Sequence, residues 1–566
     1  MSAKKIVVIG GSAAGPKAAA KARRTDETAE IILIQKDADL SMASCGYPYY
    51  VGGTFDQRAM LISTAYGAVR DPSFFMKTKG IDARTLTEAV SIDRQKKTVK
   101  IKDLKNGQEE EISYDSLILT TGATPVFPPV PGRELQGITT LQSMKDADYL
   151  RKVRDEGIVK KAVIIGGGLN GLEACEALNL AKIDTAIVER LPHLLSFLDE
   201  EMAMLVENHL RSKKVELYLE NGLASFVGEN GKLTGVQLQD GKTLPCDLAV
   251  VAVGVRPNAA LAKEAGLEIG ATGGIVVDTQ MRTSDPDIYA AGDCIEIPQL
   301  ITGKKVHAPY GDLANLEGRV AGENAALAQP TAQFPGTLQT GICKVFDFAA
   351  GTTGLSEKTA RQNGFDDIET VINASPDKPG FMTGKLLISK MVVDRKTGRV
   401  LGVQCVGPGD VSKQIAIWAT ALKGELGVED MVNADLPYAP PFSLAIDHSI
   451  ATAHLMQNKL AGRLKGVSAA QVKEKMGSLD RPLLLDVRDA KEYEAMHLGL
   501  GEKLVPLDEL HDRLGEISDN KEQEIVCYCK ISLRGYEAAL LLEAKGYKKV
   551  RVMEGGVMAW PYAREK

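Results

Sequence analysis

Two cysteines in this chain of 566 residues lie in sequence settings suited to thiolate chemistry. Cys45 is followed by Gly46 and a Tyr-Pro pair, shortly after an apolar strand of the N-terminal region. Cys529 begins the loop Cys529–Gly535, which leads from an apolar run into a helical stretch. A thiolate can attack a sulfur–sulfur bond, so the sequence predicts one chain that picks up sulfur at one thiol and reduces it at another.

The segment before Cys45 predicts a dinucleotide-binding cradle. Lys5–Ile9 is an apolar strand, Gly10–Gly15 follows it, and Pro16–Arg24 is an alanine-rich helical stretch. Glycines allow close approach of a pyrophosphate, whose charge is stabilised by the amide groups of the helix start. Ser12 stands where a glycine is expected, and Gln35 at the end of the next strand can accept a ribose hydroxyl. The predicted cofactor contacts here are Gly10, Ser12, Ala13, Ala14, Gly15, Gln35, Lys36 and Ser44.

A second cradle follows the strand Ala162–Ile165. Its glycine loop is Gly166–Gly171, and the next strand ends in Glu189. A carboxylate about 20 residues past the glycines can bind both ribose hydroxyls and repels a 2′-phosphate, which favours NAD over NADP. Arg190 beside it leaves NADPH possible. The predicted contacts are Gly166, Gly168, Leu169, Asn170, Gly171 and Glu189.

Later segments indicate that the first cradle binds FAD. The strand beginning at Ile288 ends in Gly292 and Asp293, and in flavoproteins with two dinucleotide sites such an aspartate holds the ribityl chain. Leu119–Pro125 and Val253–Asn258 resemble the two crossings between an FAD and an NAD domain. The further predicted contacts are Thr121, Gly122, Gly254 and Asp293.

Composition excludes several classes of protein. The net charge of −6 gives no basic excess, so we expect no nucleic-acid partner. No run approaches 18 apolar residues and the chain begins close to a strand, which predicts a soluble, cytoplasmic protein without a membrane partner. The eight cysteines follow no disulfide framework or zinc spacing, so we expect no metal.

The order of elements predicts an α/β protein with two Rossmann-like dinucleotide-binding domains, an α+β domain of short strands followed by helices, and a C-terminal α/β domain. The predicted ranges are 1–120 with 255–325 for the FAD-binding domain, 121–254 for the NAD-binding domain, 326–457 for the α+β domain and 468–566 for the last domain. The resemblance to flavoproteins with two dinucleotide sites implies that the α+β domain is a dimerisation domain. Asn458–Val467 is predicted to be the linker before this last domain.

The surroundings of Cys45 carry a specific resemblance. Ser41–Tyr49 and Leu436–Ser443 are similar to segments of coenzyme A disulfide reductases, and the whole chain resembles reductase–rhodanese fusions of the pyridine nucleotide-disulfide oxidoreductase family that act on coenzyme A persulfide and polysulfide. The resemblance implies a homodimer in which Tyr438 of one subunit reaches the thiol of the other. It implies coenzyme A, as ligand or carrier, near Lys21, Arg24, Ser41 and Ser44.

The last domain resembles a single-domain rhodanese. Asp486–Arg488, Glu492–Tyr493 and His497–Leu498 precede the Cys529 loop and Val552–Trp560 follows it, all in the expected order. The part of this loop from Lys530 to Leu533 departs from the glycine-containing versions. The resemblance implies a Cys529 persulfide whose outer sulfur passes to another thiol. A helix start and Arg534 would stabilise negative charge on this sulfur, so we expect Cys529 to be largely thiolate at neutral pH.

Cys45 has no second cysteine about five residues away, so it must act alone. A helix start or a cation nearby would lower its pKa. We expect an NADH-dependent FAD reductase of persulfides, polysulfides or coenzyme A disulfide, with the rhodanese domain relaying sulfane sulfur. One alternative is an NADH oxidase or peroxidase that cycles a sulfenic acid, although Ala13 and Ala14 replace the histidine of such relatives. Another is a non-catalytic flavin-containing sulfur carrier or redox sensor.

Overall fold

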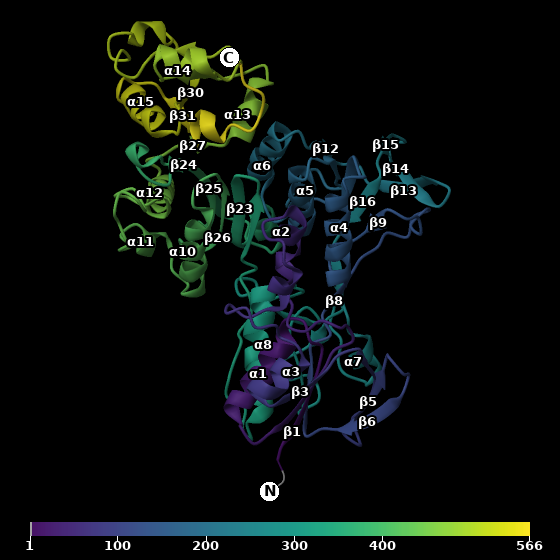
Figure 1. Ribbon diagram of the computed structural model, residues 1–566. Coiled ribbons are helices and arrows are strands. Elements are labelled where there is room, and N and C mark those ends of the chain that lie inside the picture. The colour runs from purple at the N-terminus through teal and green to yellow at the C-terminus, as the bar shows by residue number, and fades with distance from the viewer. Residues whose placement is uncertain (1–2, 566) are drawn as a thin grey trace. The chain divides into compact units, whose positions relative to one another are not determined.

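Apolar strands at the N-terminus form a parallel sheet, as their sequence predicts. In the computed structural model, which describes residues 3–565, the strand order is β19-β7-β1-β2-β3, and every adjacent pair is parallel. The strands are β1 (Lys5–Ile9), β2 (Glu30–Ile34), β3 (Ile81–Arg84), β7 (Ser116–Leu119) and β19 (Ile288–Ala290). Helices α1 (Ala14–Thr25), α3 (Pro72–Lys79) and α8 (Gly311–Ala326) lie beside this sheet (Figure 1). Buried alanines of α1 let α8 approach closely, so the helix after the first glycine loop is held firmly.

The second dinucleotide sheet repeats this design. Its strand order is β12-β11-β10-β16-β9, with parallel pairing throughout. The strands are β9 (Ile138–Thr139), β10 (Lys161–Ile165), β11 (Asp184–Val188), β12 (Glu216–Tyr218) and β16 (Leu248–Val251). Helices α4 (Met144–Glu156) and α5 (Leu169–Leu180) belong to this layer. The two segments that resemble domain crossings contribute β8 (Ala123–Pro125) and β17 (Val255–Pro257), which pair as a two-stranded antiparallel ribbon.

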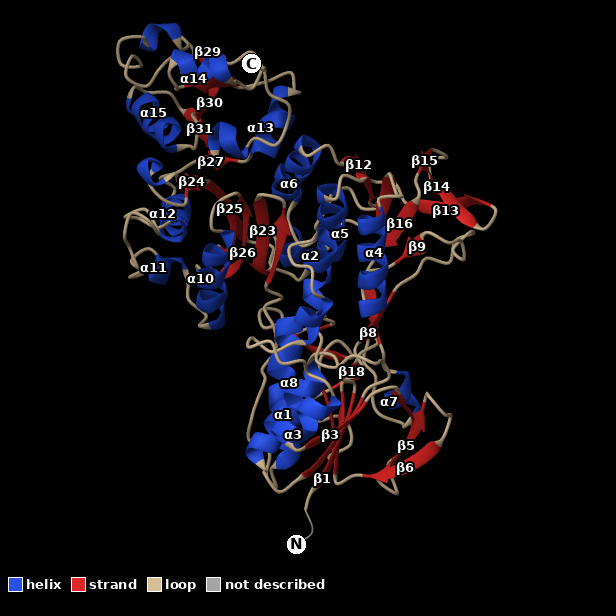
Figure 2. Cartoon of the chain, in the orientation of Figure 1, coloured by secondary structure: helices blue, strands red, loops and turns tan. Residues whose placement is uncertain are grey.

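Smaller elements complete this part of the chain. Three three-stranded sheets contain β4–β6, β13–β15 and β18, β20 and β21. Their bounds are Thr87–Asp93, Thr98–Asp103 and Glu109–Ser113; Leu223–Glu229, Lys232–Leu238 and Thr243–Pro245; and Ile275–Val276, Ile295–Pro298 and Lys305–Val306. The short helix α2 (Tyr47–Gly52) packs against α4 and α5, and α7 (Ala260–Glu264) lies beside β4 (Figure 2).

An antiparallel sheet of order β22-β23-β26-β25-β24 follows. The strands are β22 (Gly341–Val345), β23 (Phe348–Gly354), β24 (Ile368–Pro376), β25 (Leu386–Asp394) and β26 (Val400–Gly407). The accompanying helices are α9 (Glu357–Gln362), α10 (Val411–Lys423), α11 (Val428–Met431) and α12 (His448–Leu460). Strand β25 is nine residues long, and its apolar residues Met391, Val392 and Val393 lie in the core.

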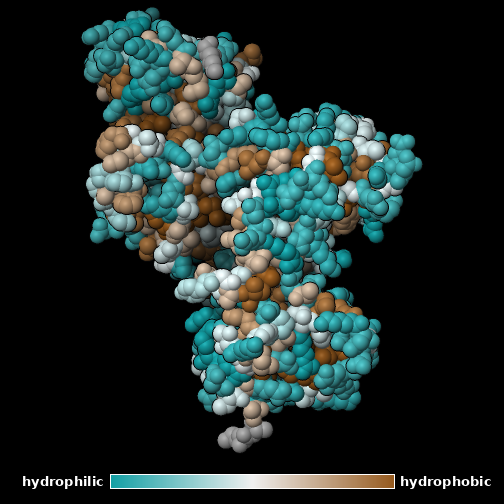
Figure 3. Space-filling view, in the orientation of Figure 1, coloured by the Kyte–Doolittle hydropathy of each residue, from teal (hydrophilic) through white to brown (hydrophobic). Residues whose placement is uncertain are grey.

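The last domain is a parallel sheet of order β27-β31-β30-β28-β29. The strands are β27 (Gly466–Val467), β28 (Leu483–Asp486), β29 (Lys503–Leu504), β30 (Glu524–Tyr528) and β31 (Lys549–Met553), and the helices are α13 (Ala469–Met476), α14 (Ala490–Ala495) and α15 (Leu533–Ala544). On the face drawn in Figure 3 its surface is largely hydrophilic. The predicted linker is shorter than expected, because α12 continues to Leu460 and Gly466 already pairs with Val552.

The chain divides into two compact units. The first contains Met1–Pro192 and Val215–Thr337, and the second contains His193–Lys214 and Leu338–Lys566. Helix α6 (Glu200–Ser212), which falls in the range predicted for the NAD-binding domain, therefore belongs to the second unit. Among the described helices, none has the length and apolarity needed to span a membrane.

Candidate active site

The first glycine loop leaves the amide groups of a helix start available. Gly10 has a φ of +109°, and a methyl group there would collide with the Thr120 backbone. The residue preceding α1, Ala13, makes no side-chain cap hydrogen bond. A helix that begins without a side-chain cap directs its first N–H groups at whatever occupies the loop, and an anion fits there. The predicted FAD pyrophosphate contact is compatible with this geometry.

The second loop has the same construction. Gly166 has a φ of +110°, and Gly168 precedes α5 without a side-chain cap. Glu189 accepts a hydrogen bond from the Gly167 N–H at 2.7 Å and another from the Leu191 N–H at 2.8 Å. In the first loop Gln35 takes the corresponding position, since its Oε1 accepts from the Gly11 N–H at 2.9 Å. Each strand-end side chain therefore holds its own glycine loop, a role that the sequence did not indicate.

Asp293 belongs to the turn that follows β19. The sequence did not reveal that a second buried carboxylate, that of Glu317, holds this turn. Glu317 of α8 accepts a hydrogen bond from the Gly292 N–H at 2.7 Å, and burial raises the pKa of Glu317 to about 7. Burial also raises the pKa of Asp293, whose carbonyl oxygen lies 2.8 Å from Nε2 of His307. The Gly-Asp turn is thus fixed from α8 through a side chain that no local motif predicts.

Cys45 lies at the N-terminal end of α8. The thiol is exposed, in a 3-10 turn at Ser44–Gly46, and its Sγ is 3.4 Å from the position that a Cβ of Gly311 would take. The start of α8, a helix of 16 residues, favours the thiolate form of a cysteine beside it. However, burial by the surrounding protein raises the pKa of Cys45, and the charges of Glu173, Asp293 and Asp312 raise it further. A helix start is therefore present beside Cys45, and the pKa of Cys45 is nevertheless raised, chiefly by desolvation.

Glu173 is a second residue that the sequence reasoning missed. It lies on α5 and accepts a hydrogen bond from Tyr49 Oη of α2 at 3.3 Å. It is also the carboxylate with the largest effect on the pKa of Cys45. The helix that follows Cys45 is thereby connected to the helix that follows the second glycine loop. Its only sequence signal is its place three residues after Asn170 in that helix.

The remaining contacts predicted in the first unit have varied surroundings. Lys21 pairs with Glu323 at 3.0 Å, Lys36 pairs with Glu88 at 2.7 Å, and Arg24 is exposed. Ser41 donates its backbone N–H to the Gly11 carbonyl at 2.7 Å, which ties the Cys45 segment to the first loop. At the crossing, Thr121 donates its hydroxyl to the Asn258 carbonyl at 2.6 Å, and Gly122 accepts from the Asn258 N–H at 2.9 Å.

Tyr438 belongs to the second unit, between α11 and α12. Its side chain is 55% exposed, and so is the surface around it, where Phe442 is 75% exposed and Ile446 is 51% exposed. The hydroxyl is accordingly accessible to another molecule. Its contact with a partner thiol stays a prediction.

Cys529 occupies a contrasting environment. It follows β30 directly, is 1% exposed, and precedes α15 by a loop in which Ser532 has a φ of +95°. This serine therefore adopts a backbone conformation that strains an L-residue. Arg534 lies beside the sulfur and is held by Glu492 through two contacts of 2.9 and 2.8 Å. Glu492 first, and Cys529 to a smaller extent, raise the pKa of Arg534.

The back of the Cys529 loop is fixed by the segment after β31. The Val557 N–H donates to the Cys529 carbonyl at 2.9 Å, and the Met558 N–H donates to the Lys530 carbonyl at 3.1 Å. Arg488 forms a buried ion pair with Asp486 at 2.6 Å and donates to the Glu492 carbonyl at 3.1 Å. These contacts join the three segments that the sequence singled out.

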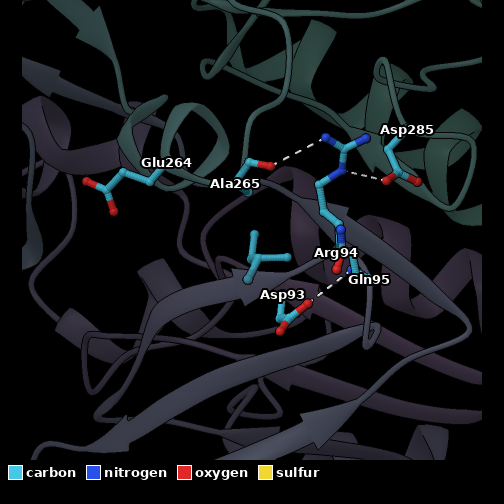
Figure 4. Close-up of a pocket in the computed structure, with 7 residues that line it drawn as sticks. Asp93, Arg94, Gln95, Glu264, Ala265 and Asp285 are labelled. Carbon is cyan, nitrogen blue, oxygen red and sulfur yellow. Dashed lines mark hydrogen bonds and ion pairs between the residues drawn. The ribbon is translucent and has the colours of Figure 1, made fainter.

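A polar recess of about 590 Å³ lies elsewhere on the first unit (Figure 4). Arg94 points across it and donates to Asp285 at 2.7 Å and to the Ala265 carbonyl at 3.4 Å. The guanidinium is therefore engaged within the protein, and the recess contains none of the predicted site residues. Among the described residues no cluster suited to a metal ion occurs.

Comparison with known proteins agrees with this geometry. Residues 4–305 match the pyridine nucleotide-disulphide oxidoreductase family, residues 340–450 match its dimerisation domain, and residues 468–562 match the rhodanese-like domain. An NAD-dependent persulfide reductase structure from A. fulgidus is 42% identical, with a TM-score of 0.93, and the alignment covers 98% of this chain and 100% of that one.

Two curated relatives match the part of the chain before the rhodanese-like domain. An NAD(P)H coenzyme A polysulfide/persulfide reductase from Pyrococcus horikoshii is 34% identical over 456 residues, 80% of this chain and 98% of the relative. An NADH oxidase from Methanocaldococcus jannaschii is 32% identical over 458 residues, 81% of this chain and 99% of the relative. The chain therefore belongs to the pyridine nucleotide-disulphide oxidoreductase family, as an FAD- and NAD(P)H-dependent enzyme with a C-terminal rhodanese-like domain.

Proposed function

We propose that this enzyme reduces persulfides, including coenzyme A persulfide and polysulfide, with electrons from NADH. The observation that carries the proposal is a single exposed thiol, Cys45, at the start of α8 and within reach of the Asp293 charge, in a chain whose eight cysteines are all free. A lone thiol can form a mixed disulfide with an external sulfur compound, whereas a dithiol would close on itself.

The chemistry at Cys45 is an exchange followed by a reduction. The Cys45 thiolate attacks the inner sulfur of R–S–SH, so that a Cys45–S–S–R bond forms and HS⁻ leaves. Two electrons and one proton then give the Cys45 thiolate and R–SH. FAD, when bound, supplies these electrons after taking them from NADH. The uncapped start of α1 and the uncapped start of α5 fit the two pyrophosphate groups that this chemistry requires.

The enzyme must form a thiolate at Cys45 against a raised pKa. The carboxylates of Glu173, Asp293 and Asp312 oppose the negative charge on sulfur. The α8 start opposes these carboxylates, and a hydroxyl such as that of the partner subunit's Tyr438 can donate a hydrogen bond to the sulfur. We therefore include a homodimer with shared active sites in the proposal, which the match to the dimerisation domain supports. A cytoplasmic location, where thiols stay reduced, is also part of it.

The rhodanese-like domain supplies sulfane sulfur. The Cys529 thiolate takes the outer sulfur from a donor R–S–SH, which leaves as R–S⁻, and passes it from Cys529–S–SH to a carrier thiol. Arg534, held by Glu492, stabilises the negative charge that accompanies both transfers. Coenzyme A is the proposed carrier, because the Pyrococcus horikoshii relative is a coenzyme A polysulfide/persulfide reductase.

A second candidate function is NADH oxidase or peroxidase activity, because a relative named NADH oxidase matches most of the chain. Cys45 would then cycle through a sulfenic acid, with hydrogen peroxide reduced to water. Ala13 and Ala14 offer no proton donor within the first glycine loop, which favours persulfide as the substrate.

Anaerobic steady-state turnover separates these candidates. Coenzyme A persulfide, inorganic polysulfide, coenzyme A disulfide and hydrogen peroxide are compared, with sulfide measured beside NADH consumption. We expect one sulfide per NADH with persulfide and a far lower kcat/KM with peroxide. Cys529→Ser should retain persulfide reduction and lose the use of donors that need relay, while the nearby buried Cys527→Ala serves as the control. Faster turnover with peroxide than with persulfide would refute the proposal.

A further inference from the structure

The rhodanese-like domain covers the free edge of the dimerisation sheet. Strand β24 is the last strand of that sheet, so its outward N–H groups have no neighbouring strand. One of them, the Ile372 N–H, donates a hydrogen bond of 2.9 Å to Oε2 of Glu554. Glu554 follows β31 of the rhodanese-like domain, and both residues lie in the second unit. An exposed sheet edge is thus closed by a side chain from the next domain.

Lys459 completes this contact with an ion pair. It lies in the last turn of α12, and its Nζ contacts the other oxygen of Glu554. The same Nζ donates to the Thr370 carbonyl at 2.6 Å and lies 3.2 Å from Oε1 of Glu369. The side chains of Lys459 and Glu554 are 13% and 4% exposed. A charged pair that is this deeply buried, with hydrogen bonds at both ends, fixes the two domains more firmly than a surface pair.

The sequence leaves room for the Glu554 carboxylate at the domain boundary. A methyl group at Gly466, in β27, would collide with this carboxylate. Before β27, the chain is bound to the end of α12, because the N–H groups of Arg463 and Leu464 both donate to the Asn458 carbonyl, at 2.8 and 3.0 Å. The boundary is therefore a hydrogen-bonded turn instead of a free tether.

Glu554 is also adjacent to the support of the reactive loop. Gly555 and Gly556 follow it, and the next two N–H groups bind the carbonyl groups of Cys529 and Lys530. A Cβ on Gly555 would come within 3.0 Å of Ile372 Cγ2, so this turn packs on β24. A short run of backbone thus connects the sheet edge to the sulfur-carrying loop.

We propose that Glu554 is a positioning residue, which with Lys459 holds the Cys529 loop on the dimerisation domain. The persulfide of Cys529 then has a fixed position and orientation on the enzyme when its outer sulfur is transferred. The inference rests on the proposed sulfur relay and adds the device that orients it. A rhodanese-like domain that is held in place presents its sulfur to the acceptor thiol at a high effective concentration. A released domain presents this sulfur only at the concentration that its tether allows.

The test uses the FAD-loaded full chain and three assays. Thiosulfate with cyanide reports Cys529 alone, coenzyme A persulfide with NADH reports Cys45 alone, and thiosulfate with coenzyme A and NADH reports the complete relay as sulfide release. Lys459→Met breaks the pair, and Lys459→Arg preserves its charge. The control is Lys465→Met, which removes the exposed pair with Glu543 at the same domain boundary.

We expect Lys459→Met to lower the relay rate at least ~10-fold, to leave both single-site assays near wild type, and to be rescued in large part by Lys459→Arg. Hydrogen exchange of the Ile372 amide should accelerate in Lys459→Met and not in Lys465→Met. Asn208 of α6 makes a second contact with the rhodanese-like domain, because its side-chain amide donates to the Pro561 carbonyl. The double variant Lys459→Met with Asn208→Ala should therefore release this domain more completely.

An unchanged relay rate in that double variant would overturn the inference, and so would an unchanged exchange rate of the Ile372 amide. A fall in all three assays together would also overturn it, since the contact would then serve only stability. Failure of the relay in the wild-type enzyme would instead reject the proposed sulfur relay, and the two failures are thereby distinguished.

Discussion

The two reactive cysteines of this enzyme stand in opposite electrostatic settings. Cys45 lies at a helix start, and desolvation by the surrounding protein, together with the charges of Glu173, Asp293 and Asp312, raises its pKa. Cys529 is buried at a helix start and has Arg534 beside it. The comparison teaches that a helix start alone does not define the environment of a thiol, because desolvation and the neighbouring charged side chains differ between the two sites.

The difference suits the two proposed tasks. A rhodanese-type cysteine must carry an anionic sulfur without help from a cofactor, and a fixed guanidinium serves that need. A thiol that receives electrons from a flavin must stay unreactive until substrate and cofactor are bound. A raised pKa limits its side reactions with oxidants.

Removing the Cys45 sulfur should have the largest effect. Cys45→Ser should lower NADH-linked sulfide release by a factor on the order of 10³ or more, because the nucleophile is lost. The variant should still bind FAD, measured by flavin absorbance, and its Cys529 should still transfer sulfur from thiosulfate to cyanide. Retained persulfide turnover would show that another group accepts the sulfur.

Removing the charge beside Cys529 should have a smaller effect. Arg534→Ala should slow sulfur transfer from thiosulfate to cyanide by roughly 10- to 100-fold, because a charge-assisted contact to the reacting sulfur is lost. The matched control is Arg551→Ala, which breaks the exposed pair with Glu524 in the same domain. Equal rates in the two variants would mean that Arg534 acts only through the fold.

Removing one carboxylate near Cys45 should reduce the electrostatic difference between the surroundings of the two thiols. Glu173→Gln should lower the pKa of Cys45, so that the thiolate fraction at neutral pH rises by roughly 2- to 5-fold. The pH dependence of alkylation by iodoacetamide, followed by peptide mass spectrometry, measures this shift. Glu229→Gln, on an exposed strand of the same unit, should leave the profile unchanged, and a shift to higher pH in Glu173→Gln would contradict the account.

The smallest effect concerns the backbone at Ser532. Ser532→Gly and Ser532→Ala both remove the hydroxyl, which donates to the Met553 carbonyl at 3.3 Å, but only glycine tolerates a φ of +95° without strain. The glycine variant should therefore be more stable than the alanine variant by about 1 kcal/mol. Urea unfolding of both variants measures the difference. Equal midpoints would indicate that this loop does not hold a strained residue.

Much of the architecture is readable from local patterns. The strand Lys5–Ile9 has the predicted bounds, because it is an apolar run that ends at a glycine loop. Helices α1 and α15 begin two residues before their predicted starts, because the Gly10–Gly15 loop and the Cys529 loop turn directly into these helices. Helix ends depend on capping contacts, which a pattern of apolar residues does not specify.

The missed parts of the site depend on contacts between distant residues. Glu317 binds the Gly292 amide, Glu173 approaches Cys45 from another helix, and Glu554 meets a strand 182 residues away in the sequence. No spacing rule predicts such contacts, because each requires the fold to be known first. The raised pKa of Cys45 has the same origin, because it depends on desolvation and on carboxylates from other segments.

The central claim is that Cys45 itself accepts the substrate sulfur compound. The most direct measurement treats the oxidised, FAD-loaded enzyme with coenzyme A persulfide under anaerobic conditions, quenches with acid, and maps adducts by peptide mass spectrometry before and after NADH is added. The account predicts a coenzyme A mixed disulfide on Cys45 that NADH removes with release of one equivalent of thiol. Turnover of NADH while Cys45 stays unmodified throughout would contradict it.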